Sequence, residues 1–170
     1  MKKIILTVAA VFAFGIASAQ DMKFGAKAGF TSLSVKAKAT GFGSVTDSET
    51  GFFAGVFGEF PISGAFSFKP EALFVSVKEL DQIQVPLHFK YNVAEGFGIL
   101  AGPNVAFLMD TADGVSSFNY GLDLGASYDI TESLVVDARY NFGLANLYED
   151  GDSDNSLKLS GFYVGLGYRF

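Results

Sequence analysis

The segment KLSGFYVGLGYRF, residues 158–170, alternates between two kinds of side chain. From Phe162 to the terminal Phe170 every second residue is large and apolar, and the residues between them are glycine, tyrosine or arginine. This period of two is typical of a β-strand with one apolar face. Because the apolar face continues to the last residue, it needs an apolar neighbour there, and a lipid bilayer is one candidate.

Residues 1–20 have the three-part layout of a secretory signal peptide. Lys2 and Lys3 form a basic start, residues 4–16 are an apolar run, and residues 17–20 supply small residues for cleavage before Asp21. The apolar run is short for a membrane-spanning helix. We therefore expect a cleaved signal peptide, 1–20, followed by one mature domain, 21–170.

The composition excludes several classes of function. Without Lys2 and Lys3 the mature chain has 10 basic residues instead of 12 against 18 acidic ones, so its net charge is −8 instead of −6. An acidic chain without a basic stripe is a poor nucleic-acid binder. The absence of cysteine excludes disulfides and thiolate metal sites. The 19 Phe and 20 Gly, with no long apolar run after residue 20, favour short alternating strands.

Eight segments of about ten residues alternate in this way. They are residues 23–33, 51–60, 65–77, 83–93, 97–109, 118–128, 134–144 and 158–170. Longer loops at 34–50, 78–82, 110–117 and 145–157 alternate with short turns at 61–64, 94–96 and 129–133. The pattern predicts an all-β, eight-stranded antiparallel up-and-down transmembrane β-barrel. Aromatic residues near the strand ends would form two interfacial belts, at Phe52, Phe66, Tyr91, Phe97, Phe118 and Tyr128.

A soluble eight-stranded barrel of lipocalin type alternates in the same way, with its apolar face inward. The apolar face here is rich in large aromatic rings, whereas the other face is mostly glycine, alanine and serine with a few charges. Small residues and paired charges fit a narrow lumen better than rings do, so the membrane barrel is favoured.

Three prolines lie inside predicted strands, at Pro70, Pro86 and Pro103. A closed barrel has no free edge on which a proline can place its missing N–H group. We therefore expect bulges or strand ends near these residues.

The mature chain resembles the bacterial outer-membrane β-barrel proteins of the small porin-like, PorT-like and OmpX-like kinds. The resemblance rests on segments such as GFFAGVFGEFP at 51–61, IQVPLHFKYNV at 83–93, DARYNFGLANL at 137–147 and GLGYRF at 165–170. It implies a monomer in the outer membrane of a Gram-negative bacterium, in contact with outer-membrane lipid. It also implies insertion by the barrel-assembly machinery, which would read an assembly signal at Phe162, Val164, Leu166, Tyr168 and Phe170.

The inward face of such a barrel would carry a polar network. Its members would be Lys23, Lys27, Glu59, Lys69, Glu71, His88, Lys90, Asp123, Asp137, Arg139 and Arg169. If the neighbouring turns are symmetric, Asp123 lies opposite Arg139 and Glu59 lies diagonal to Lys69. The network would fill the lumen of an eight-stranded barrel, with a narrow ion path as the alternative.

Other candidate sites are weaker. His88 is the single histidine and has no nucleophile motif, which argues against an enzyme. Asp150, Asp152 and Asp154 have calcium-loop spacing, but Gly161 stands where that loop needs its bidentate carboxylate. We therefore expect no cofactor and no metal.

The sequence favours a non-enzymatic porin-family barrel of the cell envelope, with a charge-plugged lumen and with loops that act in surface interaction, adhesion or envelope integrity. The alternatives are a narrow porin-like channel for ions or small solutes and a membrane subunit of an envelope or secretion machine.

Overall fold

The computed structural model describes residues 22–39, 43–78, 80–109, 111, 114–148 and 156–170. The predicted signal peptide and the Asp150, Asp152 and Asp154 repeat lie outside these residues. No helix among the described residues is long and apolar enough to cross a membrane.

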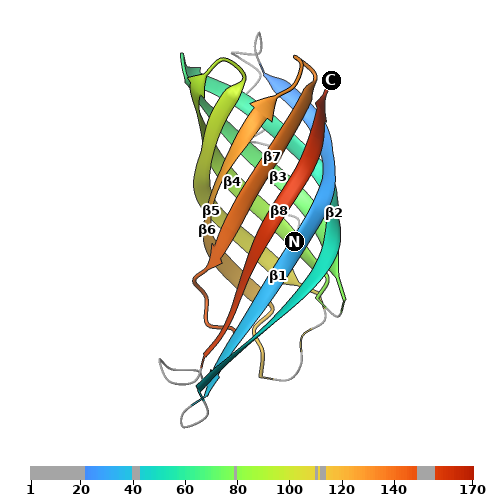
Figure 1. Cartoon of the computed structure of the whole chain (residues 1–170), viewed down its shortest axis with the longest axis vertical. Helices are drawn as coiled ribbons and strands as arrows, with labels where there is room; N and C mark the ends of the chain where they lie inside the picture. Colours follow the sequence, from blue (N-terminus) through green and yellow to red (C-terminus); the bar gives the residue numbers. More distant parts are fainter. Residues whose placement is uncertain (1–21, 40–42, 79, 110, 112–113, 149–155) are drawn as a thin grey trace, which may run out of the picture.

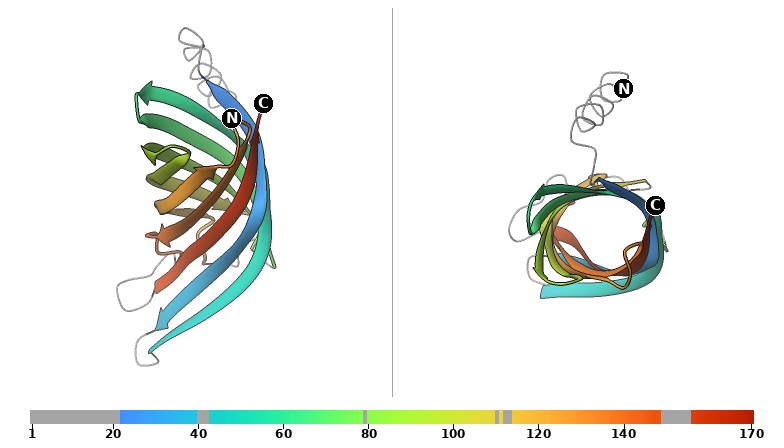
Figure 2. Two further views of the ribbon diagram at one scale, coloured as in Figure 1. Left: turned by 45° about the horizontal axis from the view of Figure 1, so that its top comes forward. Right: turned by 90° about the horizontal axis from the view of Figure 1, so that it is seen from above.

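Eight antiparallel strands form one closed barrel, in which β1 pairs with both β2 and β8 (Figures 1 and 2). This confirms the predicted fold. The strands are β1 (Lys23–Ala39), β2 (Gly43–Ser63), β3 (Phe66–Val77), β4 (Gln82–Ala94), β5 (Phe97–Leu108), β6 (Phe118–Asp129), β7 (Leu134–Gly143) and β8 (Ser156–Arg169). A closed ring leaves no strand edge along the wall, so each strand can be hydrogen-bonded on both sides.

The connections divide between the two ends of the barrel. We call the end with the turns at 64–65, 95–96 and 130–133 the turn end, and the opposite end the loop end. Gly64 and Gly96 make two of the tight turns with positive φ angles of 32° and 71°, a conformation that glycine adopts without a steric penalty. The C-terminus lies at the turn end (Figure 1).

Alternate residues of each strand face opposite sides of the wall, as the sequence predicts. The outward face carries most of the aromatic rings, and Phe30 and Phe170 are the most exposed, at 79% and 84%. All five residues of the predicted assembly signal, Phe162 to Phe170 in steps of two, are outward and exposed. Phe66 and Tyr91 stack at the turn end with their ring centroids 4.6 Å apart. A broad apolar exterior of this kind needs an apolar surrounding.

The inward face differs from the expectation in one respect. It is not uniformly small or polar, because Phe53, Phe57, Leu73, Leu100 and Tyr163 point inward and are almost fully buried. Glycines of β8, two strands away in the closed sheet, make room for the Phe53 and Phe57 rings of β2. A Cβ atom at Gly165 would lie 2.7 Å from the Phe53 ring, and one at Gly167 would lie 3.0 Å from the Phe57 ring.

The predicted loop at 34–50 is wrong. β1 continues to Ala39 and β2 begins at Gly43, and the two pair without a break in register from Lys23–Glu59 to Ala39–Gly43. The segment is polar because its outward face lies beyond the aromatic wall. Its side chains still alternate between the outward and inward faces of the sheet. β8 pairs with the same part of β1 as far as Ser156. We call this three-stranded extension, residues 34–38, 44–50 and 156–160, the projecting sheet (Figure 1).

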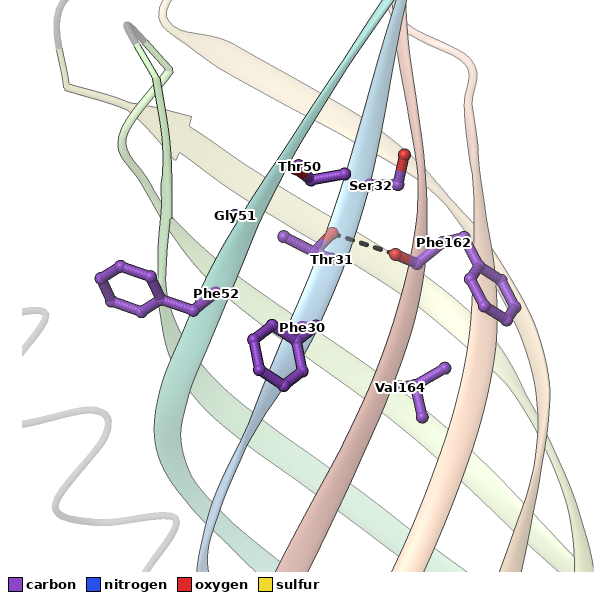
Figure 3. A pocket seen from close by; sticks show the side chains of 8 residues that line it. All are labelled: Phe30, Thr31, Ser32, Thr50, Gly51, Phe52, Phe162 and Val164. Carbon is purple, nitrogen blue, oxygen red and sulfur yellow. Dashed lines mark hydrogen bonds between the residues drawn. The ribbon is translucent and has the colours of Figure 1, made fainter.

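Figure 3 shows where the aromatic wall ends on this side of the barrel. Phe30, Phe52 and Phe162 point outward around a hollow of about 510 Å³, and Ser32 and Thr50 replace them at the next outward positions. The outward face therefore changes from apolar to hydroxylated at the base of the projecting sheet, which marks the edge of the apolar band.

The expectation that Asp123 lies opposite Arg139 also needs correction. Asp123 lies opposite Asn141, and Arg139 lies opposite Gly125, because the turn after β6 is not symmetric about residue 131. The hydroxyl of Thr131 accepts hydrogen bonds from the backbone N–H groups of Ser133 and Leu134, and this cap holds the turn.

The expected bulges at the three prolines are absent, but each proline interrupts a ladder. Pairing between β2 and β3 stops at Phe57–Glu71 and resumes at Phe60–Phe68, across Pro70. Equivalent gaps in the β3–β4 and β4–β5 ladders face Pro86 and Pro103, and the register is the same on both sides of each gap. Each proline, with its missing N–H group, thus lies in a gap of two residue pairs while the register is kept.

Candidate functional site

The lumen contains three successive clusters of buried side chains. From the turn end to the loop end they are a small charged cluster, a larger central charged cluster and an apolar cluster. Each is built by inward positions of several strands, so the closed wall brings together residues that are far apart in the sequence.

The central cluster bridges the lumen from one wall to another. The Nζ atom of Lys27 on β1 lies 2.6 Å from Oδ2 of Asp137 on β7 and 3.1 Å from Oε2 of Glu71 on β3. Neither β7 nor β3 is a neighbour of β1 in the sheet. All three side chains are at most 1% exposed. Lys27 therefore ties three separate parts of the wall together inside the barrel.

Glu71 contacts three basic side chains of the central cluster. Besides Lys27, it accepts a hydrogen bond of 2.9 Å from Nη1 of Arg139 and lies 3.4 Å from Nζ of Lys69. Lys69 also lies 3.4 Å from Asp137. Carboxylates and cations thus alternate in space, which is the arrangement that makes buried charge tolerable.

Asp123 organises the β4–β7 side of the central cluster. One of its oxygens lies 2.8 Å from Nε2 of His88, and the other accepts a hydrogen bond of 2.6 Å from the amide of Asn141. The amide of Asn104 donates to the same carboxylate, and Nε of Arg139 lies 3.4 Å away. The cluster contains three basic residues, Lys27, Lys69 and Arg139, against the carboxylates Glu71, Asp123 and Asp137. Formal charge is therefore balanced without His88.

The turn-end cluster closes the other side of the lumen. Glu59 accepts hydrogen bonds from Lys90 at 3.2 Å and from Arg169 at 3.0 Å. Asp129 lies 2.7 Å from Nη2 of Arg169 and 3.4 Å from Nζ of Lys90. Glu59, which was predicted to lie diagonal to Lys69, thus forms its ion pairs with cations of β4 and β8. Arg169, the last residue of β8, links this strand to β2 and to β6.

The loop end of the lumen is mostly apolar, although the buried side chains of Gln82 and Asn119 also lie there. Ten buried residues pack together there, and two of them, Ala145 and Leu147, come from the connection after β7. The other eight are Leu33, Phe53, Leu73, Val75, Val77, Leu108, Leu159 and Tyr163. The guanidinium of Arg139 lies 4.5 Å from the centre of the Tyr163 ring, so a cation–π contact joins this cluster to the central one.

Most of the predicted network is buried in these clusters. Lys27, Glu59, Lys69, Glu71, His88, Lys90, Asp123, Asp137, Arg139 and Arg169 are all at most 7% exposed. Lys23 differs, because it lies at the first position of β1 and is exposed. Sequence reasoning missed Asp129, which was placed in a turn, and it missed the apolar cluster, although its residues occupy the inward positions of the same alternation.

His88 lies at the junction of two carboxylates. Its Nε2 contacts Asp123, and its Nδ1 lies 3.7 Å from Oε1 of Glu71. Gly102 on β5 stands beside it, as the sequence suggests: a Cβ atom there would lie 3.0 Å from the His88 Cα. The ring is fully buried. It therefore serves as a linker within the network.

Comparison with known proteins identifies relatives of this fold. The family model described as outer membrane protein beta-barrel domain matches residues 4–170. Neisserial surface protein A is 17% identical in sequence with a TM-score of 0.50, and the match covers 89% of this chain and 100% of that one. Ail, the attachment invasion locus protein of Yersinia pestis, is 16% identical with a TM-score of 0.52 over the same shares of the two chains. No curated protein matches this chain in sequence.

Proposed function

This chain belongs to the outer membrane protein beta-barrel domain family, and we propose that within the family it is a closed, non-conducting barrel that acts in surface interaction through its projecting sheet. The family places the protein in the bacterial outer membrane. Within that membrane the barrel anchors the chain, and the loop end makes the surface interactions.

The observation that carries the proposal is the bridging of the lumen by Lys27. A permeating ion would have to pass between Lys27 and its partners on β3 and β7, whose nitrogen–oxygen distances are 3.1 and 2.6 Å. Beyond this point it would meet the closely packed side chains of the apolar cluster. An eight-stranded barrel is just wide enough for side chains to fill its interior. The channel alternative is therefore disfavoured.

The projecting sheet supports a role at the surface. Its outward face carries hydroxyl and lysine side chains, and Lys36 lies directly opposite Lys158 in the β1–β8 register. This polar face continues beyond the aromatic wall, so it lies outside the apolar part of the membrane. In outer-membrane barrels the longer connections face the exterior, and we therefore assign the loop end to the outside of the cell.

Two measurements test the closed barrel. Protein refolded in detergent is expected to migrate differently before and after boiling, because a membrane barrel resists unfolding by the detergent alone. The unboiled, folded species is then added to planar lipid bilayers, where no conductance steps above background are expected. Regular conductance steps that the folded species produces and boiled protein does not would refute the closed barrel and support the narrow channel.

A trimmed variant tests the role of the projecting sheet. Replacing residues 34–48 by Asn-Gly joins Leu33 to Glu49, which are paired in the structure, through a two-residue hairpin turn. We expect the trimmed protein to insert and to keep its heat-modifiable migration, while cells that make it attach to surfaces no better than cells without the gene. Protease added to intact wild-type cells is expected to cut within residues 34–50. Full attachment by the trimmed strain would refute the proposed role.

A further inference from the structure

The second strand has an open edge in the projecting sheet. β2 pairs with β3 only as far as Gly51, which lies opposite Val77, where β3 ends. Among the described residues, β2 from Gly43 to Thr50 pairs with β1 alone. The corresponding part of β8 is better covered, because Leu147 donates its backbone N–H to the Leu157 carbonyl there. An open strand edge is a template for another strand.

The hydrogen-bond pattern shows which groups this edge offers. Phe170 donates its N–H to the carbonyl of Phe24, so the even-numbered residues of β1 bond to β8 and the odd-numbered ones bond to β2. Their partners on β2 are odd-numbered as well. The backbone groups of Ser44, Thr46, Ser48 and Thr50 therefore point away from β1, toward the open side. In agreement, the N–H of Ser48 is bonded to the carboxylate of Asp47, its chain neighbour, at 2.9 Å.

A pocket lies beside this edge on the inner face of the projecting sheet. It has a volume of about 350 Å³, and its lining residues are Leu33, Val35, Asp47, Glu49, Lys78 and Leu80. The three aliphatic side chains supply apolar contact, and the exposed carboxylates of Asp47 and Glu49 stand along the edge strand. Lysine and arginine have an apolar stem and a cationic head, so their side chains match this lining. Lys78 is the one cation of the lining and lies where β3 ends.

We infer that the open edge of β2 over residues 44–50 binds an extended segment of a partner protein as an added strand, with its lysine or arginine side chains in the adjacent pocket. The inference rests on the proposed function, because it names the class of partner for the projecting sheet. Main-chain hydrogen bonds to the even-numbered residues would hold the strand, and alternate side chains would reach the pocket. Asp47 would release the Ser48 N–H to the incoming carbonyl and turn to the incoming cation.

Charge complementarity favours a foreign basic segment over a second copy of this chain. Residues 43–50, GSVTDSET, contain two acidic residues and no basic one. An edge-to-edge pair of two copies would bring Asp47 and Glu49 of one copy toward those of the other, and facing like charges destabilise a strand pair. The exposed Val45, the next inward residue of the same edge, adds an apolar contact for the partner's strand.

The test uses the folded full-length barrel in detergent and a synthetic peptide of sequence TKTKTVT, labelled with fluorescein at one end. The bound peptide is expected to continue the line of β3 and to run antiparallel to β2. In that register its lysines lie opposite Glu49 and Asp47, and its valine lies opposite Val45. Fluorescence anisotropy is expected to show saturable binding. A peptide of sequence TETETVT is expected to bind at least roughly tenfold more weakly, because its carboxylates would face two carboxylates.

Variants of the barrel separate the edge from the pocket. Thr46→Pro removes one edge donor and leaves the β1 ladder intact, so it is expected to weaken TKTKTVT binding by roughly fivefold or more. Thr46→Val keeps the N–H group and is the matched control, with unchanged binding. The double variant Asp47→Asn, Glu49→Gln is expected to weaken binding roughly tenfold, whereas Lys78→Gln should not weaken it.

Three outcomes would overturn the inference. They are no saturable binding of TKTKTVT, equal binding of the two peptides, or equal binding by the Thr46→Pro and Thr46→Val proteins. Wild-type dimers that Thr46→Pro disrupts, seen by size-exclusion chromatography, would make a second copy the occupant instead. Failure of the peptide to bind would leave the proposed function intact if the trimmed strain still loses attachment, whereas conductance steps would refute the closed barrel whatever the peptide does.

Discussion

Replacement of Glu71 by Gln is the sharpest test of the central charged cluster. The substitution keeps the shape of the side chain and removes one negative charge. In the structure, Glu71 lies 2.9 Å from Arg139, 3.1 Å from Lys27 and 3.4 Å from Lys69, and its side chain is fully buried. Three cations would then face two carboxylates, so one buried positive charge would lack a partner.

An uncompensated buried charge costs about 3–5 kcal/mol. We therefore expect Glu71→Gln to lower the free energy of unfolding by about this amount. The assay is urea unfolding of the barrel in lipid vesicles, followed by the fraction of protein with folded migration on unboiled gels. Lys36→Gln, at an exposed position, is the control and should change the free energy by no more than about 0.5 kcal/mol.

A second substitution checks that charge balance is the cause. Adding Lys69→Met to Glu71→Gln restores equal numbers of cations and carboxylates in the central cluster. We expect the double variant to be at least about 1 kcal/mol more stable than Glu71→Gln alone, because contacting residues couple by this order. A loss of less than about 1 kcal/mol in the single variant, or a double variant less stable than the single one, would refute the reasoning.

Three further changes test other parts of the barrel. Gly102→Ala should lower the free energy of unfolding by about 1–3 kcal/mol in the same urea assay, because its Cβ atom would overlap the Leu87 carbonyl oxygen across the β4–β5 ladder. Tyr163→Phe should cost about 1–3 kcal/mol, because it leaves the buried amide of Gln84 without its hydroxyl partner, and normal stability would argue against that hydrogen bond. Deletion of Phe170 should reduce the amount of heat-modifiable barrel in cell membranes while refolding of the purified protein in detergent stays near normal, and normal insertion in cells would remove the assembly role of the last residue.

The sequence predicts the wall of the barrel well because every strand shows one simple period. From residue 51 onward the outward and inward faces follow directly from alternation, and so does the burial of charged residues such as Arg139. The projecting sheet was missed because serine, threonine and lysine alternate there with small aliphatic or acidic residues. The polar composition of these residues predicted a loop, although the apolar residues Val35, Val45 and Leu157 still occupy alternate, inward positions.

The contacts inside the lumen could not be predicted, because they depend on the stagger of strands that are not neighbours. A change of two residues at the turn before β7 moves Arg139 from Asp123 to Gly125 in the pairing. The partners of Lys27 lie on β3 and β7, and only the closed ring brings these strands to face β1. Asp129 was missed for a related reason, because β6 extends one residue further than its alternation suggests.

The closed lumen and the open edge of β2 assign the two parts of the proposed function, a non-conducting barrel and a binding surface, to separate regions of the chain. Within the wall every strand has two neighbours, and the ion pairs of the interior hold the walls to one another. The ion pairs of the central cluster include no residue of the projecting sheet among the described residues, and Thr46, Asp47 and Glu49 are exposed. Substitutions at Thr46, Asp47 or Glu49 should then change binding without changing urea stability, whereas Glu71→Gln should do the reverse.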